Sequence, residues 1–183
     1  MTVQTTKLTP SLLARKILCT AYMPAPFGQG ERLVFLGLHA MTVVKVIARH
    51  LRMGYRLRSV ERGGKGYRID LLFDGDSGRT RIVEVKSSKQ MKEVHRIQAA
   101  LYPHASADEI VVSNRETDEV LTPDFIEQTH RQAELTRQLL AGNPTLASTT
   151  YTPHHDICYT CANLSCPFPP STRQLAVANP TPR

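Results

Sequence analysis

The sequence contains little that would carry the chain into or across a membrane. Residues 1–10 are polar and hold no apolar stretch, so we expect no signal peptide there. The most apolar segment, 33–44, is followed by Lys45, Arg49 and Arg52, and its length predicts that it is too short to cross a bilayer. No internal repeat is visible. These absences argue against a secreted or membrane-spanning protein and favour a cytoplasmic location.

Cysteine is scarce, and every cysteine falls into one pattern. The four positions are Cys19, Cys158, Cys161 and Cys166. In a reducing compartment such a set, with no cysteine left over, is typical of a metal or cluster site rather than of disulfides. Spacing does not choose between zinc and an iron–sulfur cluster. His154 and His155 also allow a zinc knuckle, in which Cys19 would be an ordinary buried thiol.

Acidic residues are rare in the first half of the chain. The 183-residue sequence has a net charge of +7, and between Arg49 and Arg68 seven basic residues accompany only Glu61. This surplus favours a polyanionic partner such as nucleic acid, because lysine and arginine displace counterions from phosphates. A basic strand surface without function is the alternative. The composition, 41% hydrophobic and 21% charged, is ordinary for a soluble globular domain.

Hydrophobic spacing and helix caps predict helices and strands in mixed order. We expect helices near 9–19, 31–53, 91–102 and 122–142, and strands near 55–61, 67–73, 80–86 and 109–113. The helix at 31–53 is expected to be mostly buried. The order predicts an α/β fold with a mixed central sheet flanked by helices. A cysteine knuckle at 158–166 and a flexible tail at 168–183 should follow.

Two strands of this sheet carry acidic and basic side chains together. Alternation along a strand places Glu84 and Lys86 on one face. Strong turn residues at 74–78 predict a hairpin centred on Ser77, with Asp70 directly opposite Glu84. Opposed residues have Cβ atoms roughly 5 Å apart. Two carboxylates that close favour a hard divalent cation, although an exposed, solvated strand face is the simpler interpretation.

A histidine, a glutamine and a tyrosine extend this candidate site. His39 lies inside the long apolar helix, where it is either a satisfied core histidine or a metal ligand beside carboxylates. Gln98 and Tyr102 stand four residues apart and therefore share one helix face. They form either a polar helix edge or a pair of hydrogen-bonding groups for a phosphate.

These residues resemble those of a known nuclease superfamily. Asp70, Glu84-Val85-Lys86 and Gln98-x-x-x-Tyr102, preceded by His39 on a helix, are similar to the RecB-like branch of the PD-(D/E)XK nucleases. The resemblance implies that His39, Asp70, Glu84 and the Val85 carbonyl bind Mg²⁺ or Mn²⁺. It implies that Lys86 helps to activate water and that Gln98 and Tyr102 contact DNA. The catalytic set is then Asp70, Glu84, Lys86, Gln98 and Tyr102.

The cysteines narrow the resemblance to one family. One cysteine before the nuclease core and three after it are similar to the CRISPR-associated RecB-like exonucleases, which carry an iron–sulfur cluster. The resemblance implies a single nuclease domain over 1–167, whose two ends hold the cluster through Cys19, Cys158, Cys161 and Cys166. A 4Fe–4S cluster is expected, with 2Fe–2S as the alternative. The implied function is 5′ to 3′ exonuclease action on single-stranded DNA ends for spacer acquisition, beside CRISPR spacer-integration proteins.

The sequence departs from this family at three places. Thr20-Ala21 follow Cys19 where Pro-Arg is expected, Ala40 follows His39 where an acid is common, and the final cysteine gap is one residue tighter. These departures bear on the subfamily and on the type of cluster. Two other functions stay open: a zinc-clasped DNA-binding module without nuclease activity, and a RecB-like repair nuclease unconnected with CRISPR.

Overall fold

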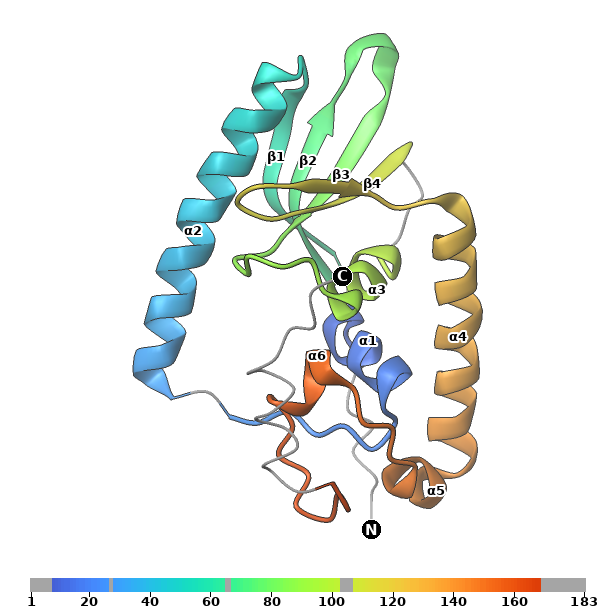
Figure 1. Ribbon diagram of the computed structural model, residues 1–183. Coiled ribbons are helices and arrows are strands. Elements are labelled where there is room, and N and C mark those ends of the chain that lie inside the picture. The colour runs from blue at the N-terminus through green and yellow to red at the C-terminus, as the bar shows by residue number, and fades with distance from the viewer. Residues whose placement is uncertain (1–7, 27, 65–66, 103–106, 169–183) are drawn as a thin grey trace.

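Among the residues that the structure describes, five strands form one sheet in the order β1-β2-β3-β4-β5 (Figure 1). The structure is a computed structural model that describes residues 8–26, 28–64, 67–102 and 107–168. The strands are β1 (Arg56–Gly64), β2 (Tyr67–Asp74), β3 (Thr80–Val85), β4 (Glu109–Ser113) and β5 (Asp118–Val120). The helices are α1 (Pro10–Leu18), α2 (Gln29–Arg52), α3 (Glu93–Ala100), α4 (Pro123–Gly142), α5 (Pro144–Thr149) and α6 (His155–Cys158).

The sheet is mixed, as the order of elements predicts. Strand β2 is antiparallel to both β1 and β3, whereas β3 and β4 are parallel and β5 is antiparallel to β4. The parallel pair requires a crossover, and α3 supplies it. This arrangement confirms the α/β fold with a mixed sheet flanked by helices. Strand β5 and helices α5 and α6 were not predicted, because none exceeds six residues.

The hairpin between β2 and β3 has the register that its turn residues predict. Leu71 pairs with Val83. A short 3-10 helix, Asp76–Gly78, closes the hairpin, and Gly78 takes a φ of 79° that suits glycine. Asp70 lies one residue before Leu71, and Glu84 lies one residue after Val83. The two carboxylates are therefore opposite each other, at the end of the hairpin away from the turn.

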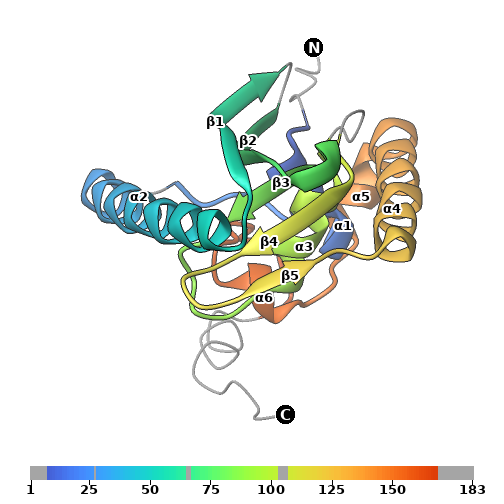
Figure 2. The same ribbon diagram turned by 90° about the horizontal axis from the view of Figure 1, so that it is seen from above.

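Helices cover both faces of the sheet, as Figures 1 and 2 show. On one face, Val46 of α2 packs with Leu71 and Val83. On the other face, Ala99 of α3 packs with Val112 of β4. Helices α1 and α4 pack against α3 on the side away from the sheet. Because side chains alternate along a strand, the face that carries Glu84 is the α3 face.

Helix α2 differs from the prediction in its burial. Only its later half packs against the sheet, through a stripe that includes Thr42, Val46 and His50. Its earlier half extends beyond the sheet (Figure 1), where Leu33 and Val34 are 71% and 63% exposed, and in the later half Val44, on the side away from the sheet, is 66% exposed. The expectation of a mostly buried helix was wrong. Helical spacing shows which residues share a face, but it does not show whether another element covers that face.

The same helix is longer than the apolar segment that the sequence marks. Residues Arg32–Arg52 of α2 have the length and composition of a membrane span, with a mean hydropathy of 1.4, and 17% of that window is buried in the protein. Length and composition alone are weak evidence, since helices of soluble proteins meet the same criteria. The later half of α2 is fixed to the sheet by Arg49, whose guanidinium donates to Asp118 and to the carbonyl of Asn114.

The two ends of the described chain lie against each other. Pro24 and Cys161 form a β-bridge, the Ala162 N–H donates to the Met23 carbonyl at 2.8 Å, and Asn163 donates to the Ala21 carbonyl at 2.8 Å. The tail predicted at 168–183 begins at Phe168, and its remaining residues lie outside the described residues.

Candidate active site

Glu84 is the centre of a buried polar cluster. Its side chain comes from β3, is 2% exposed and lies beneath α3. One carboxylate oxygen accepts a hydrogen bond from Gln98 Nε2 at 2.7 Å and pairs with Lys86 Nζ. The other oxygen accepts from the Tyr102 hydroxyl at 2.5 Å. The carboxylate is therefore held in one orientation by three partners.

These partners also bind one another. Lys86 Nζ donates to the Gln98 amide oxygen at 3.1 Å, and Gln98 Nε2 lies 3.2 Å from the Tyr102 hydroxyl. We call Asp70, Glu84, Lys86, Gln98 and Tyr102 the carboxylate cluster. Gln98 lies on α3, whereas Tyr102 lies two residues beyond the last residue of that helix, Ala100, so the helix predicted over 91–102 is too long at this end. Both side chains nevertheless meet Glu84, and burial together with the nearby carboxylate raises the pKa of Tyr102. In this structure they position the carboxylate.

Asp70 is the member of the cluster that comes from β2, and it is itself largely buried. One oxygen accepts a hydrogen bond from the Val85 backbone N–H at 2.8 Å. Burial, and then the neighbouring charge of Glu84, raise the pKa of Asp70 to about 7. A carboxyl group with so high a pKa marks a place where negative charge is crowded and incompletely neutralised.

His39 reaches the same place from the opposite side. Its Nε2 lies 3.8 Å from an Asp70 oxygen, and the side chain is 30% exposed. Burial and the positive charge of Lys86 lower the pKa of His39, so the imidazole is neutral near pH 7 and has a lone pair to offer. His39 thus lies at the rim of the site and is not a core histidine.

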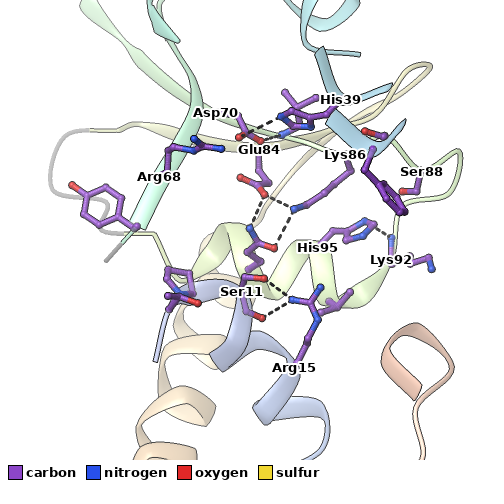
Figure 3. Close-up of a pocket in the computed structure, with 18 of the residues that line it drawn as sticks. Ser11, Arg15, His39, Arg68, Asp70, Glu84, Lys86, Ser88, Lys92 and His95 are labelled. Carbon is purple, nitrogen blue, oxygen red and sulfur yellow. Dashed lines mark hydrogen bonds and ion pairs between the residues drawn. The ribbon is translucent and has the colours of Figure 1, made fainter. Parts of the chain in front are cut away.

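The carboxylate cluster opens into a large cleft (Figure 3). This cavity has a volume of about 830 Å³ and is lined by residues of α1, α2, β2, β3 and α3, by the segment 86–88 that follows β3, and by Tyr159. Its charged walls hold five basic side chains and two acidic ones: Arg15, Arg32, Arg68, Lys86, Lys92, Asp70 and Glu84. The positive excess means that an anionic molecule is the favoured occupant.

The four cysteines line a second, smaller cavity. Cys19, Cys158, Cys161 and Cys166 surround it together with Tyr22, Ile157 and Phe168. The backbone N–H of His154 donates to Cys158 Sγ at 3.2 Å, and that of Thr152 donates to Cys19 Sγ at 3.5 Å. Burial raises the pKa of the Cys158 thiol, and the neighbouring cysteines raise it further. Hydrogen bonds aimed at sulfur are common where thiolates bind a metal or cluster.

Neither cluster is arranged as a finished metal site. Within the described ranges, no three His, Cys, Asp or Glu side chains are already positioned to hold an ion. The chemistry of the donors does fit. Asp70, Glu84 and His39 offer hard oxygen and nitrogen ligands for Mg²⁺ or Mn²⁺, and four sulfurs around one cavity offer soft ligands for zinc or an iron–sulfur cluster.

Comparisons with known proteins add little to this geometry. No family model matches the chain, and no curated protein matches it. A solved structure with some likeness is the SPO1766 protein of unknown function from Silicibacter pomeroyi, at a TM-score of 0.28 and 18% identity. The match covers 58% of this chain and 92% of that one. A likeness this weak carries no argument about fold or function.

Sequence reasoning missed the residues that complete the cleft. Arg15, Lys92, His95 and Tyr159 line it beside the carboxylate cluster, but no motif connects them in the sequence. Tyr159 follows Cys158, so a pattern search records it only as a spacer between cysteines. Its place in the cleft depends on the packing of the last described segment against α3, which spacing does not encode.

Proposed function

We propose that this protein is a metal-dependent exonuclease for single-stranded DNA that carries an iron–sulfur cluster. The supporting observation is a crowded pair of carboxylates, Asp70 and Glu84, at the base of a cleft with a positive excess. The family resemblance adds the 5′ to 3′ direction and the trimming of DNA ends for CRISPR spacer acquisition. Spacer-integration proteins are then its partners.

Each residue has a separate task in this proposal. A bound Mg²⁺ or Mn²⁺ supplies an activated water and a Lewis acid for phosphodiester hydrolysis. His39, Asp70, Glu84 and the Val85 carbonyl would hold it. Lys86 lies next to Glu84 and stabilises negative charge that develops on the phosphate. Gln98 and Tyr102 keep the Glu84 carboxylate in place, which favours a fixed geometry at the reacting phosphate.

The cysteines have a structural task in this proposal. A cluster bound to Cys19, Cys158, Cys161 and Cys166 would join the two ends of the described chain, which already meet through backbone hydrogen bonds. Binding free energy at such a site adds directly to folding stability. No redox chemistry is needed for DNA cleavage.

The proposal is tested with an end-labelled DNA strand and Mn²⁺. Glu84→Gln and Lys86→Ala should abolish degradation while circular dichroism and thermal melting show a folded protein. Matched controls are Glu127→Gln on α4 and Lys45→Ala on α2, because both residues are exposed and outside the cleft. Degradation by both active-site variants at the rate of the controls would contradict the proposal.

A second measurement separates the alternatives. Anaerobically purified protein should be brown and contain iron and sulfide. Colourless protein with one zinc per chain and no degradation of DNA would support a zinc-clasped binding module instead. Cleavage without any link to spacer acquisition would support a repair nuclease.

A further inference from the structure

One wall of the cleft combines two cations with an exposed aromatic ring. Arg15 comes from α1, Lys92 is the N-cap of α3, and Tyr159 is the C-cap of α6. Lys92 Nζ donates to the Tyr159 hydroxyl at 3.0 Å and lies 4.3 Å from the centre of its ring. All three residues line the cleft that contains Asp70 and Glu84. We call these three residues the Tyr159 wall.

The cations of this wall have neutral hydrogen-bond partners. In the described part of the chain, neither Arg15 nor Lys92 forms an ion pair with a carboxylate. Arg15 Nη1 donates to the carbonyl and hydroxyl oxygens of Ser11. A guanidinium has five N–H donors, so these two contacts leave others for a ligand. Arg32 of α2, which also lines the cleft, likewise has no ion pair among the described residues.

The pKa of the neighbouring His95 is affected by the same positive charges. His95 lies one helical turn after Lys92 and also lines the cleft. Burial, and then the positive charges of Lys86 and Lys92, lower its pKa to about 3. A protonated imidazole is unfavourable among these cations, whereas an anion between them would be stabilised.

The ring of Tyr159 indicates which class of anion the cleft binds. The Tyr159 side chain is 48% exposed, although it lies beside a cation that holds it in place. An exposed tyrosine beside a lysine, with an arginine in the same cleft, is a combination that suits single-stranded nucleic acid, because bases stack on the ring and cations bind the phosphates. A paired base in a duplex has no free face for such stacking.

We infer that the Tyr159 wall binds a single DNA strand beside the carboxylate cluster, with a base stacked on Tyr159 and phosphates bound by Arg15 and Lys92. This inference rests on the proposed function and names how its substrate is held. Lys92 precedes Gln98 by six positions, which is roughly 9 Å along a helix axis. One strand can therefore contact both the wall and the cluster.

The test is binding of a fluorescein-labelled single strand of about 12 nucleotides, followed by anisotropy without added divalent metal. Tyr159→Leu should weaken binding roughly 5- to 100-fold, and Tyr159→Phe should bind like the unchanged protein because it keeps the ring. Arg15→Gln and Lys92→Gln should each reduce the slope of log K against log salt by about 0.7. Arg137→Gln, on exposed α4, is the matched control. Thermal melting confirms that each variant is folded.

The outcomes separate this inference from the proposed function. If Tyr159→Leu, Arg15→Gln and Lys92→Gln all bind DNA as well as the control does, the Tyr159 wall does not bind the strand. This holds even if DNA is cleaved with Mn²⁺. Weakened binding by these variants, with no cleavage by the unchanged protein, would support strand binding by the Tyr159 wall and would contradict the proposed nuclease activity. An equal effect of Tyr159→Leu on a duplex of the same sequence would overturn the assignment to single strands.

Discussion

The carboxylate cluster and the cysteine cavity are built in opposite ways. The cluster comes from residues 70–102, a hairpin and the helix that follows it. The cavity joins Cys19 to Cys158, which are 139 positions apart (158 minus 19), and so depends on closure of the whole chain. The geometry of the first site is therefore set by strand register, whereas the geometry of the second depends on the folding of the whole chain. Substitutions should therefore affect the two regions differently.

The largest expected effect is on activity alone. Glu84→Gln should reduce cleavage of single-stranded DNA by about a hundredfold or more, because it removes a charge that a metal and Lys86 both need. Stability should change little, since the glutamine keeps most of the shape and one acceptor for the Tyr102 hydroxyl. Initial rates of strand degradation and calorimetric melting check the two halves of this prediction. A large fall in melting temperature would show that the cluster also supports the fold.

The cysteine cavity should show the reverse behaviour. Cys161→Ser removes one of four sulfurs, and we expect a loss on the order of 5 kcal/mol of unfolding free energy if a metal or cluster is bound. Strand binding should weaken as well, because Tyr159 lies between Cys158 and Cys161 in the chain. Differential scanning calorimetry with iron and zinc analysis measures this effect. Unchanged stability and metal content in Cys161→Ser would disprove a structural clasp.

Two valines two residues apart in α2 test the corrected burial of that helix. Val46 is fully buried against the sheet, whereas Val44 is 66% exposed. We expect Val46→Ala to lower the free energy of unfolding by roughly 2 kcal/mol and Val44→Ala to change it by less than about 0.5 kcal/mol. Urea denaturation measures both. Equal losses would mean that the exposed face of α2 is covered in solution.

The smallest effect is a dependence of stability on pH. Burial and neighbouring cations lower the folded-state pKa of His95 to about 3, below its ordinary value near 6.5. The unfolded chain therefore binds a proton more readily, and stability falls as pH decreases from about 6.5 toward 3. The limiting slope is about 1.4 kcal/mol per pH unit for one group, reduced in practice by partial exposure. Urea denaturation from pH 7 to pH 5 should show a shallower dependence in His95→Gln than in the unchanged protein, and equal slopes would contradict this assignment.

Much of the fold could be predicted from the sequence because its signals are local. Thr122, Pro123 and the apolar spacing after them mark the start of α4. Thr122 does cap this helix, because its hydroxyl accepts a hydrogen bond from the Phe125 backbone N–H. The turn at 74–78 fixes the hairpin register and thereby sets Asp70 opposite Glu84. The exposure of α2 could not be predicted, since it depends on where the sheet ends.

The candidate site was predictable only in part, because some of its contacts depend on tertiary packing and not on local signals. The sequence identified Asp70, Glu84 and Lys86, and alternation along the strands places them together. It did not reveal that Gln98 and Tyr102 bond Glu84 directly, because helix spacing gives a shared face without naming what the face meets. Arg15 and Tyr159 come from distant segments, and only tertiary packing brings them into the cleft.

Binding of Mn²⁺, measured by electron paramagnetic resonance, tests the central claim most directly. The crowding of Asp70 and Glu84 predicts one bound ion per chain in the unchanged protein and strongly reduced binding in Asp70→Asn and Glu84→Gln. The same Mn²⁺ binding in all three proteins would contradict a metal site at this pair of carboxylates.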